Sequence, residues 1–323
     1  MLSTNAFLQA MVPLYIISLV GLVSRRMKIL PQHANQVITQ LMLYITLPAL
    51  ILFSLHAKLT VELMADFAWM VTMSIFILSV SVFAGAWLRK KAALPWKQKS
   101  VYESLIIFGN QGFIGFAVSY MLIAEQGIIY LTLFNICYLI LIWTYGIYLF
   151  TRNEQSVNWR GLFFNPGILS TLIGLGMLFL PFSWPAPILN TFESLGKVTI
   201  PLSMILIGSM LADIQREDLW KYSKNVYLWM AAGCKLLFLP LFLLIFLLFH
   251  VSYPLIIIAV MTSAMPSAST TSVYAQKFGG DAVFASFGVI LTTLLCTFTI
   301  PLLYSLLHWL RPFFYDGAVF IFQ

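Results

Sequence analysis

The sequence has few charged residues. Only 9% of its 323 residues are Asp, Glu, Lys or Arg, whereas 61% are hydrophobic, and the mean hydropathy is +0.92. A soluble chain of this length needs far more charge to cover its surface. The scarcity of charge excludes a soluble globular protein and predicts an integral membrane protein whose surroundings are the lipid bilayer.

Residues that support metal or redox chemistry are also scarce. The three cysteines, Cys137, Cys234 and Cys296, lie within apolar stretches at spacings unlike any metal motif, so we interpret them as small core hydrophobes. The apolar segments hold no pair of carboxylates at mid-membrane depth, and the histidines do not cluster. A membrane-embedded enzyme would need clustered carboxylates or a Ser, His and Asp arrangement. We therefore expect no metal, no cofactor and no enzymatic activity.

Long apolar runs, by contrast, are abundant. A transmembrane helix needs about 20 largely apolar residues. Ten runs meet this requirement, at about 6–24, 36–56, 67–88, 101–123, 127–150, 163–181, 194–212, 226–249, 254–275 and 282–308.

The basic residues are distributed unevenly among the connections. Fourteen of the 18 Lys and Arg residues fall after the first, third, fifth, seventh and ninth segments. The positive-inside rule assigns these connections to the cytoplasm, so we expect both termini outside. The net charge of +7 is then explained by topology, and we expect no nucleic-acid partner.

The ten segments divide into two groups of five around a polar stretch. Because five is odd, the second group must be inserted upside down relative to the first, as in inverted-repeat transporters. Each half also carries a proline-led apolar run, LPALILFSL from Leu47 and IPLSMILIGSML from Ile200. We predict an all-α polytopic membrane protein of two inverted five-helix repeats, 1–150 and 163–323, joined by a cytoplasmic linker at 151–162.

The fourth segment of each half is interrupted. FGNQGFIGF, at 108–116, combines three glycines with two amide side chains, and MPSASTTSVYA, at 265–275, combines a proline with a run of hydroxyls. Pro266 removes one backbone donor and frees the carbonyl of Thr262. Because broken backbone is tolerated only against protein or a water-filled cavity, we expect both segments inside the protein. Converging half-helix N-termini would suit an anion such as a carboxylate.

These interruptions supply the candidate substrate-binding residues. Each break is either part of a binding site or purely structural. The structural alternative is open because glycines also mark close helix packing and because a proline kink can serve packing alone. Matching positions in the two halves favour a binding site. Tyr274 could line this site or pack between helices. The candidates are Gly109, Asn110, Gln111, Gly112, Pro266, Ser267, Ser269, Thr270 and Tyr274.

Lys235 is the one basic residue deep within a predicted segment. It either complements the charge of an anion, with a role in binding or coupling, or pairs with carbonyls at a helix break. Glu103, near the start of the fourth segment, is expected to face the membrane interface with Lys99. Asp281 is expected to be solvated or to cap the tenth segment.

Three motifs resemble those of a known family. VYAQKFGGD, from Val273, follows the PSA at 266–268 and resembles the second-half signature of the auxin efflux carrier family, which includes the plant PIN carriers and bacterial organic-acid carriers. GNQGFIGF, from Gly109, is similar to the first-half counterpart, and LPALILF, from Leu47, to the second-helix motif. The order and spacing of the motifs extend the resemblance over essentially the whole chain.

The resemblance implies an elevator-type carrier. Helices one, two, six and seven would form a scaffold, and helices three to five and eight to ten a mobile transport domain in which helices four and nine cross. The substrate carboxylate would bind beside the crossing, with Asn135 of segment five as a further candidate. The plant carriers have a proline soon after the first-half glycine, whereas this chain has Phe116 and Ala117. We therefore expect a milder break in segment four.

Together these features predict a secondary transporter of small organic anions, such as malate or malonate, in a bacterial cytoplasmic membrane. The alternative is a carrier of an aromatic, auxin-like monocarboxylate; a channel or a membrane-embedded enzyme is less favoured. A homodimer is compatible with the sequence.

Overall fold

The structure, a computed structural model, describes residues 4–31, 33–56, 61–151, 166–179, 184–212, 222–249 and 251–316. Within these ranges the chain is helical and contains no β-strand, which confirms the all-α class. The expected linker at 151–162 lies outside the described residues except for Thr151, the last residue of a helix.

The helices of the first half are interrupted in several places. They are α1 (Thr4–Arg26), α2 (Ala34–Leu41), the π-helical turn η1 (Met42–Thr46), α3 (Leu47–Ser54), α4 (Val61–Lys91), α5 (Trp96–Ile107), the π-helical turn η2 (Gln111–Gly115) and α6 (Phe116–Thr151).

The second half has a similar character. Its elements are α8 (Pro166–Phe179), α9 (Ala186–Lys197), α10 (Thr199–Ala212), α12 (Val226–Gly233), η3 (Cys234–Phe238), α13 (Leu239–Phe242), η4 (Leu243–Phe249), α14 (Tyr253–Ser263), α15 (Thr270–Lys277), α16 (Ala282–Arg311) and η5 (Pro312–Asp316).

Six of the described helical stretches are long and apolar enough to cross a membrane. They are Ala34–Phe53, Met64–Lys91, Phe116–Thr151, Ala186–Ala212, Val226–Phe249 and Ala282–Tyr315. The fourth and ninth predicted segments are instead divided into shorter pieces, α5 with the start of α6, and α14 with α15. That the chain has ten membrane spans therefore remains a prediction.

Large apolar side chains cover the outside of these helices. Phe83 on α4 and Phe298 on α16 are each 74% exposed. In water such exposure would be unfavourable, whereas lipid is as apolar as the side chains. The exposed apolar surface therefore supports an integral membrane protein.

Helix α6 contains a sharp kink. Ile123 and Ala124 depart from helical geometry, and Ala124 has a φ of 49°. This left-handed conformation is unfavourable for a residue with a Cβ. The kink falls between the predicted segments 101–123 and 127–150, so α6 consists of two helical pieces on either side of a change in chain direction.

Helices α1 and α10 pack closely through glycines. A Cβ added to Gly21 would lie 2.2 Å from the carbonyl oxygen of Ile205, and a Cβ added to Gly208 would lie 1.7 Å from that of Ser18. Neither position can hold a side chain unless the helices separate. Small residues that allow such close backbone approach are typical of helix pairs in membranes.

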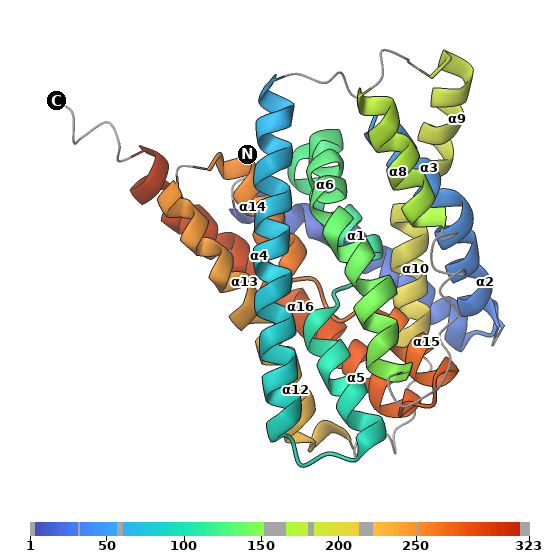
Figure 1. Cartoon of the computed structure of the whole chain (residues 1–323). Coiled ribbons are helices and arrows are strands. Elements are labelled where there is room, and N and C mark those ends of the chain that lie inside the picture. Colours follow the sequence, from blue (N-terminus) through green and yellow to red (C-terminus); the bar gives the residue numbers. More distant parts are fainter. Residues whose placement is uncertain are drawn as a thin grey trace.

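Other contacts join the helices into two groups. Besides the α1–α10 pair, α3 contacts α8 and α9, and α2 contacts α10. In the second group, α4 packs on α5 and α6, α5 on α12 and α16, and α14 on α4 and α6. The two groups meet where α1 contacts α6 and α16, α3 contacts α6, and α10 contacts η2. Figure 1 shows α2, α3, α8, α9 and α10 together on the right and α4, α12, α13 and α14 on the left.

Candidate functional site at the crossing of two broken helices

The two predicted breaks meet in space. The backbone is non-helical at 108–110, between α5 and η2, and at 264–269, between α14 and α15. Gly109 and Ser267 form an isolated antiparallel β-bridge between the two breaks. The interruption in segment four is the shorter one, in keeping with the absence of a proline there.

Two backbone hydrogen bonds close this crossing. The amide of Asn110 donates to the carbonyl of Pro266 at 2.6 Å, and the amide of Ala268 donates to the carbonyl of Phe108 at 2.9 Å. A buried backbone group without a partner costs several kcal/mol in an apolar setting. Each break therefore satisfies the backbone groups that the other leaves over, so the two segments must fold together.

Side chains from neighbouring helices fix the crossing. Ser267 Oγ donates to the carbonyl of Leu105 at 2.7 Å, and the Ser267 amide donates to Thr292 Oγ1 of α16 at 3.0 Å. Tyr138 of α6 donates its hydroxyl hydrogen to the carbonyl of Gly109 at 2.6 Å. Ser267 thus has a structural role. Thr292 and Tyr138 were missed by the sequence argument because they lie in ordinary apolar helices.

The Thr262 carbonyl has a hydrogen-bond partner, although Pro266 was expected to leave it without one. The chain turns at Ala264, and the amide of Met265 donates to Thr262 O at 3.3 Å. Pro266 instead presents its own carbonyl to Asn110 across the crossing. Pro266 therefore lies just after the end of α14, and its carbonyl accepts a hydrogen bond from the other break.

Lys235 reaches the crossing from η3. Its side chain is only 2% exposed, and Nζ donates to the carbonyl of Ile107, the last residue of α5, at 3.3 Å. A Cβ on Gly109 would lie 3.0 Å from Nζ, so glycine makes room for the ammonium. Two roles were considered for Lys235, binding an anion and pairing with carbonyls at a helix break. The contact observed is of the second kind. A cation is favourable there because the C-terminus of a helix carries partial negative charge.

Asn110 and Ser269 border a narrow crevice beside the crossing. Asn110 is 6% exposed, and it follows the break directly. The opposite walls belong to α10, with Ile207, Met210 and Leu211, and to α16, with Val289, Ile290 and Thr293. The crevice therefore lies where the broken helices face a helix of the other group.

Several polar side chains near the crossing are buried without a hydrogen-bond partner among the described residues. They include Gln111 Oε1, Asn135 Oδ1 and Thr270 Oγ1. Gln111 directly follows Asn110, and Asn135 lies one helical turn before Tyr138, which contacts Gly109. Unpaired buried polar atoms cost about 1–3 kcal/mol each. Such a group of atoms is well suited to hydrogen-bond a polar ligand.

The remaining candidates differ in their surroundings. Gly112 could hold a methyl group without a clash, since an added Cβ would be in ordinary van der Waals contact with Leu47 Cδ2 at 3.7 Å. Tyr274 is buried between Phe150 and Phe278, with ring centroids 6.1 and 6.0 Å away. The structure therefore places Tyr274 in helix packing and outside the lining of the crevice.

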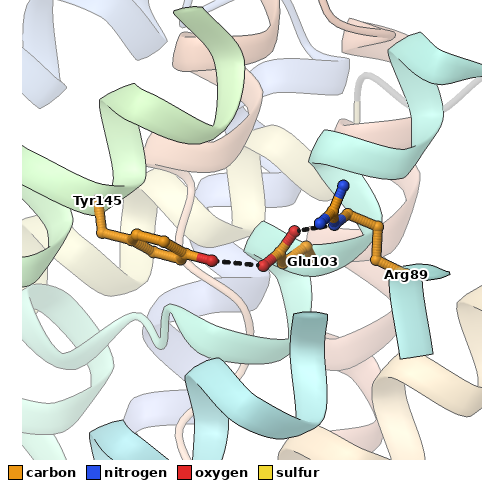
Figure 2. Close-up of polar contacts among 3 residues, drawn as sticks. All are labelled: Arg89, Glu103 and Tyr145. Carbon is orange, nitrogen blue, oxygen red and sulfur yellow. Dashed lines mark hydrogen bonds and ion pairs between the residues drawn. The ribbon is translucent and has the colours of Figure 1, made fainter. Parts of the chain in front are cut away.

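Glu103 contradicts the expectation that it faces the interface with Lys99. Its side chain is fully buried, and Oε2 lies 2.5 Å from Nε of Arg89. Tyr145 donates its hydroxyl hydrogen to Glu103 Oε1 at 2.7 Å. Figure 2 shows the carboxylate held between these two side chains, one from α4 and one from α6. The sequence suggested Lys99 as the partner of Glu103 because the two are four residues apart on one helix. The actual partner, Arg89, lies on α4, before the connection that leads into α5.

Asp281 follows the capping prediction. Its Oδ1 accepts a hydrogen bond from the amide of Phe284 at 2.9 Å, which makes it the N-cap of α16. Gln98 also donates to its Oδ2 at 2.9 Å. The cap thereby joins the start of α16 to the start of α5.

Comparison with known proteins identifies the family. A family described as "Membrane transport protein" matches residues 6–304. The chain belongs to this family of transporters. The match confirms the resemblance to the auxin efflux carriers drawn from the three motifs, and the family is one of transporters rather than enzymes.

A curated relative supports the assignment. An uncharacterized transporter of Methanocaldococcus jannaschii is 22% identical over 207 residues, which cover 61% of this chain. The alignment spans 66% of the relative, slightly less than two thirds of its length. The chain is therefore an integral membrane protein of this transporter family, with a helical fold.

Proposed function

We propose that this transporter is a secondary carrier of small organic anions, and that the anion binds beside the crossing. The observation that carries the proposal is the antiparallel contact between the two breaks, with both Lys235 and Asn110 directly beside it. Lys235 contributes positive charge, while Asn110 and the unpaired amides contribute hydrogen bonds. A carboxylate matches this combination of groups.

The size of the anion is less constrained than its charge. Dicarboxylates such as malate and malonate are the first candidates, because the polar groups near the crossing are numerous. The crevice beside Asn110 has mainly apolar walls, including Met210 and Ile290, and this favours an aromatic monocarboxylate as the second candidate.

The proposed mechanism is an elevator-type movement within a fold of ten spans in two inverted repeats. In this scheme, α1, α2–α3, α8 and α9–α10 form the scaffold, and the remaining helices form the transport domain. The pairing of α1 with α10 and of α3 with α8 and α9 supports this scaffold, and the contacts of α3 with α6 and of α10 with η2 form its boundary with the transport domain. We further propose a bacterial cytoplasmic membrane with both termini outside, since the basic connections follow odd-numbered segments.

Asn110→Ala tests the position of the site. We expect this variant to lose transport almost completely, because the substitution removes the amide that borders the crevice. The backbone bond from Asn110 to Pro266 would remain, so the protein should stay folded. The measurement is uptake of labelled carboxylate into proteoliposomes, with size-exclusion chromatography and thermal unfolding as controls. Wild-type uptake by a folded variant would rule out the proposed site.

Lys235→Ala tests the source of the positive charge. We expect the KM for the anion to rise about tenfold or more, which corresponds to a loss of about 1.4 kcal/mol in binding. Lys235→Met serves as a second variant that keeps most of the side-chain volume and lacks the charge. An unchanged KM in both variants would show that Lys235 acts only on the carbonyl of Ile107.

A further inference from the structure

A second hollow lies on the same face of α10 as the crevice. It is a cavity of about 210 Å³ bordered by Leu50 and Phe53 of α3, Tyr120 and Ile128 of α6, Lys197 at the end of α9, and the start of α10. Like the crevice, it lies between the two groups of helices. Its polar groups are Lys197 and the hydroxyl of Tyr120, neither of which belongs to the crossing.

The two hollows are aligned along one helix. Ile200 borders the cavity, whereas Ile207 and Leu211 border the crevice. Spacings of seven and four residues keep side chains on one face of a helix, and seven residues correspond to about 10 Å of rise. Both hollows therefore lie on the same face of α10.

The cavity is remote from the basic end of the molecule. In Figure 1, α9 lies at the top, whereas α5 and α12 lie at the bottom, near the end of α4. The end of α4 carries Arg89, Lys90 and Lys91, which the positive-inside rule assigns to the cytoplasm. On that topology the cavity is in the outer half of the protein.

Lys197 is accessible from the cavity. It lies in the first turn of the predicted segment 194–212, where a lysine can reach the membrane interface. Its Nζ lies 2.6 Å from Glu193 Oε1, one helical turn earlier, and 6.0 Å from the centre of the Phe53 ring. The Lys197 and Glu193 side chains are 45% and 36% exposed. An ion pair this exposed is weak, so another carboxylate can displace Glu193.

We propose that the cavity is an outer docking site for the transported carboxylate, in which Lys197 holds the anion and Glu193 competes for the same ammonium. This inference rests on the proposed function as an organic-anion carrier. The apolar side of the ligand would lie against Phe53 and Tyr120, and the anion would then pass along α10 to the crossing.

Two variants of the pair separate docking from a structural role. If the anion docks on Lys197, Lys197→Gln should raise the KM about fivefold, and Glu193→Gln should lower it about twofold, with kcat little changed in either. If the pair only stabilises α9, the two substitutions remove the same interaction and should act in the same direction. Lys197→Arg, which keeps the charge, should retain the wild-type KM.

The experiment is concentration-dependent uptake of labelled malate, malonate and indole-3-acetate into proteoliposomes. Lys91→Gln is the matched control, because it removes one positive charge at the opposite end of the molecule, where Lys91 lies over Trp87. Thermal unfolding checks that each variant is folded. Opposite shifts in KM for the two Gln variants, with rescue by arginine, would support the docking site.

Failure of this inference can be distinguished from failure of the proposed function. If the wild type transports a carboxylate and Lys197→Gln keeps its KM, or both Gln variants shift the KM in the same direction, the docking site is wrong and the carrier function stands. If the wild type carries no carboxylate in either uptake or counterflow, both proposals are overturned.

Discussion

At the scale of single residues, the crossing depends on the absence of a side chain at Gly109. The missing Cβ leaves room for the Lys235 ammonium, which would otherwise lie 3.0 Å from it, and for the carbonyl of Met265, which would lie 3.4 Å away. Glycine was recognisable in the sequence as a helix breaker. Its second role could not be predicted, because Lys235 lies more than a hundred residues away and its direction depends on the packing of η3.

This geometry predicts the effect of Gly109→Ala. The new methyl group should displace the tip of Lys235 by a few tenths of an ångström, so we expect a KM several-fold higher and a nearly unchanged melting temperature. The displaced atoms belong to a flexible side chain, which is why stability should be spared. Uptake kinetics and thermal unfolding measure the two effects.

Gly112→Ala is the matched control for Gly109→Ala. An added Cβ at Gly112 meets nothing closer than 3.7 Å, although Gly112 lies in the same motif. Equal loss of transport in the two variants would mean that helix flexibility, and not the position of Lys235, explains the effect.

At the scale of helices, the buried Glu103 connects α5 to both of its neighbours. Arg89 from the end of α4 and Tyr145 from α6 bind its two oxygens. Because α5 leads directly into the break at 108–110, this contact sets the direction from which the chain enters the crossing. The sequence indicated the break itself through its glycines and amides. It could not assign the partner of Glu103, since Arg89 is one of several basic residues nearby.

Glu103→Gln should therefore destabilise the protein. Removing one charge leaves the buried end of Arg89 without its counter-ion, and we expect a loss of about 2 kcal/mol or more in the free energy of unfolding. Glutamine keeps the size of the side chain and can still accept a hydrogen bond from Tyr145. The measurement is equilibrium or thermal unfolding in detergent.

Glu193→Gln is the comparison for Glu103→Gln. It breaks the exposed pair with Lys197, and exposed pairs within a helix contribute only about 0.3–0.5 kcal/mol. A stability loss for Glu103→Gln no larger than for Glu193→Gln would contradict the assigned role of the buried carboxylate.

At the scale of the whole molecule, composition predicted the membrane setting and the helical class. Apolar runs located most helices to within a few residues, as for α1 and α16. The sequence could not predict which helices are neighbours, because helices such as α1 and α10 are apolar on all sides and show no face that prefers a particular partner. Only the glycines at 21 and 208 mark their contact, and glycine in a membrane helix has several other uses.

The antiparallel crossing is the place where the interrupted segments of the two halves meet. The breaks at 108–110 and 264–269 come from opposite halves of the chain and satisfy each other's backbone groups. With Lys235 beside them and a crevice toward α10, they form the proposed site at the boundary between two groups of helices. In the proposed mechanism, a relative movement of these groups carries a ligand bound there.

The most direct test of this account is substrate-induced current from the purified protein in liposomes, challenged with malate, malonate, succinate, citrate and indole-3-acetate. Imposed proton and sodium gradients would identify the coupling ion, and radiolabelled counterflow would detect electroneutral exchange. The account predicts saturable transport of at least one carboxylate, lost in Asn110→Ala. Absence of both current and counterflow across the panel would contradict the assignment of organic anions as substrates.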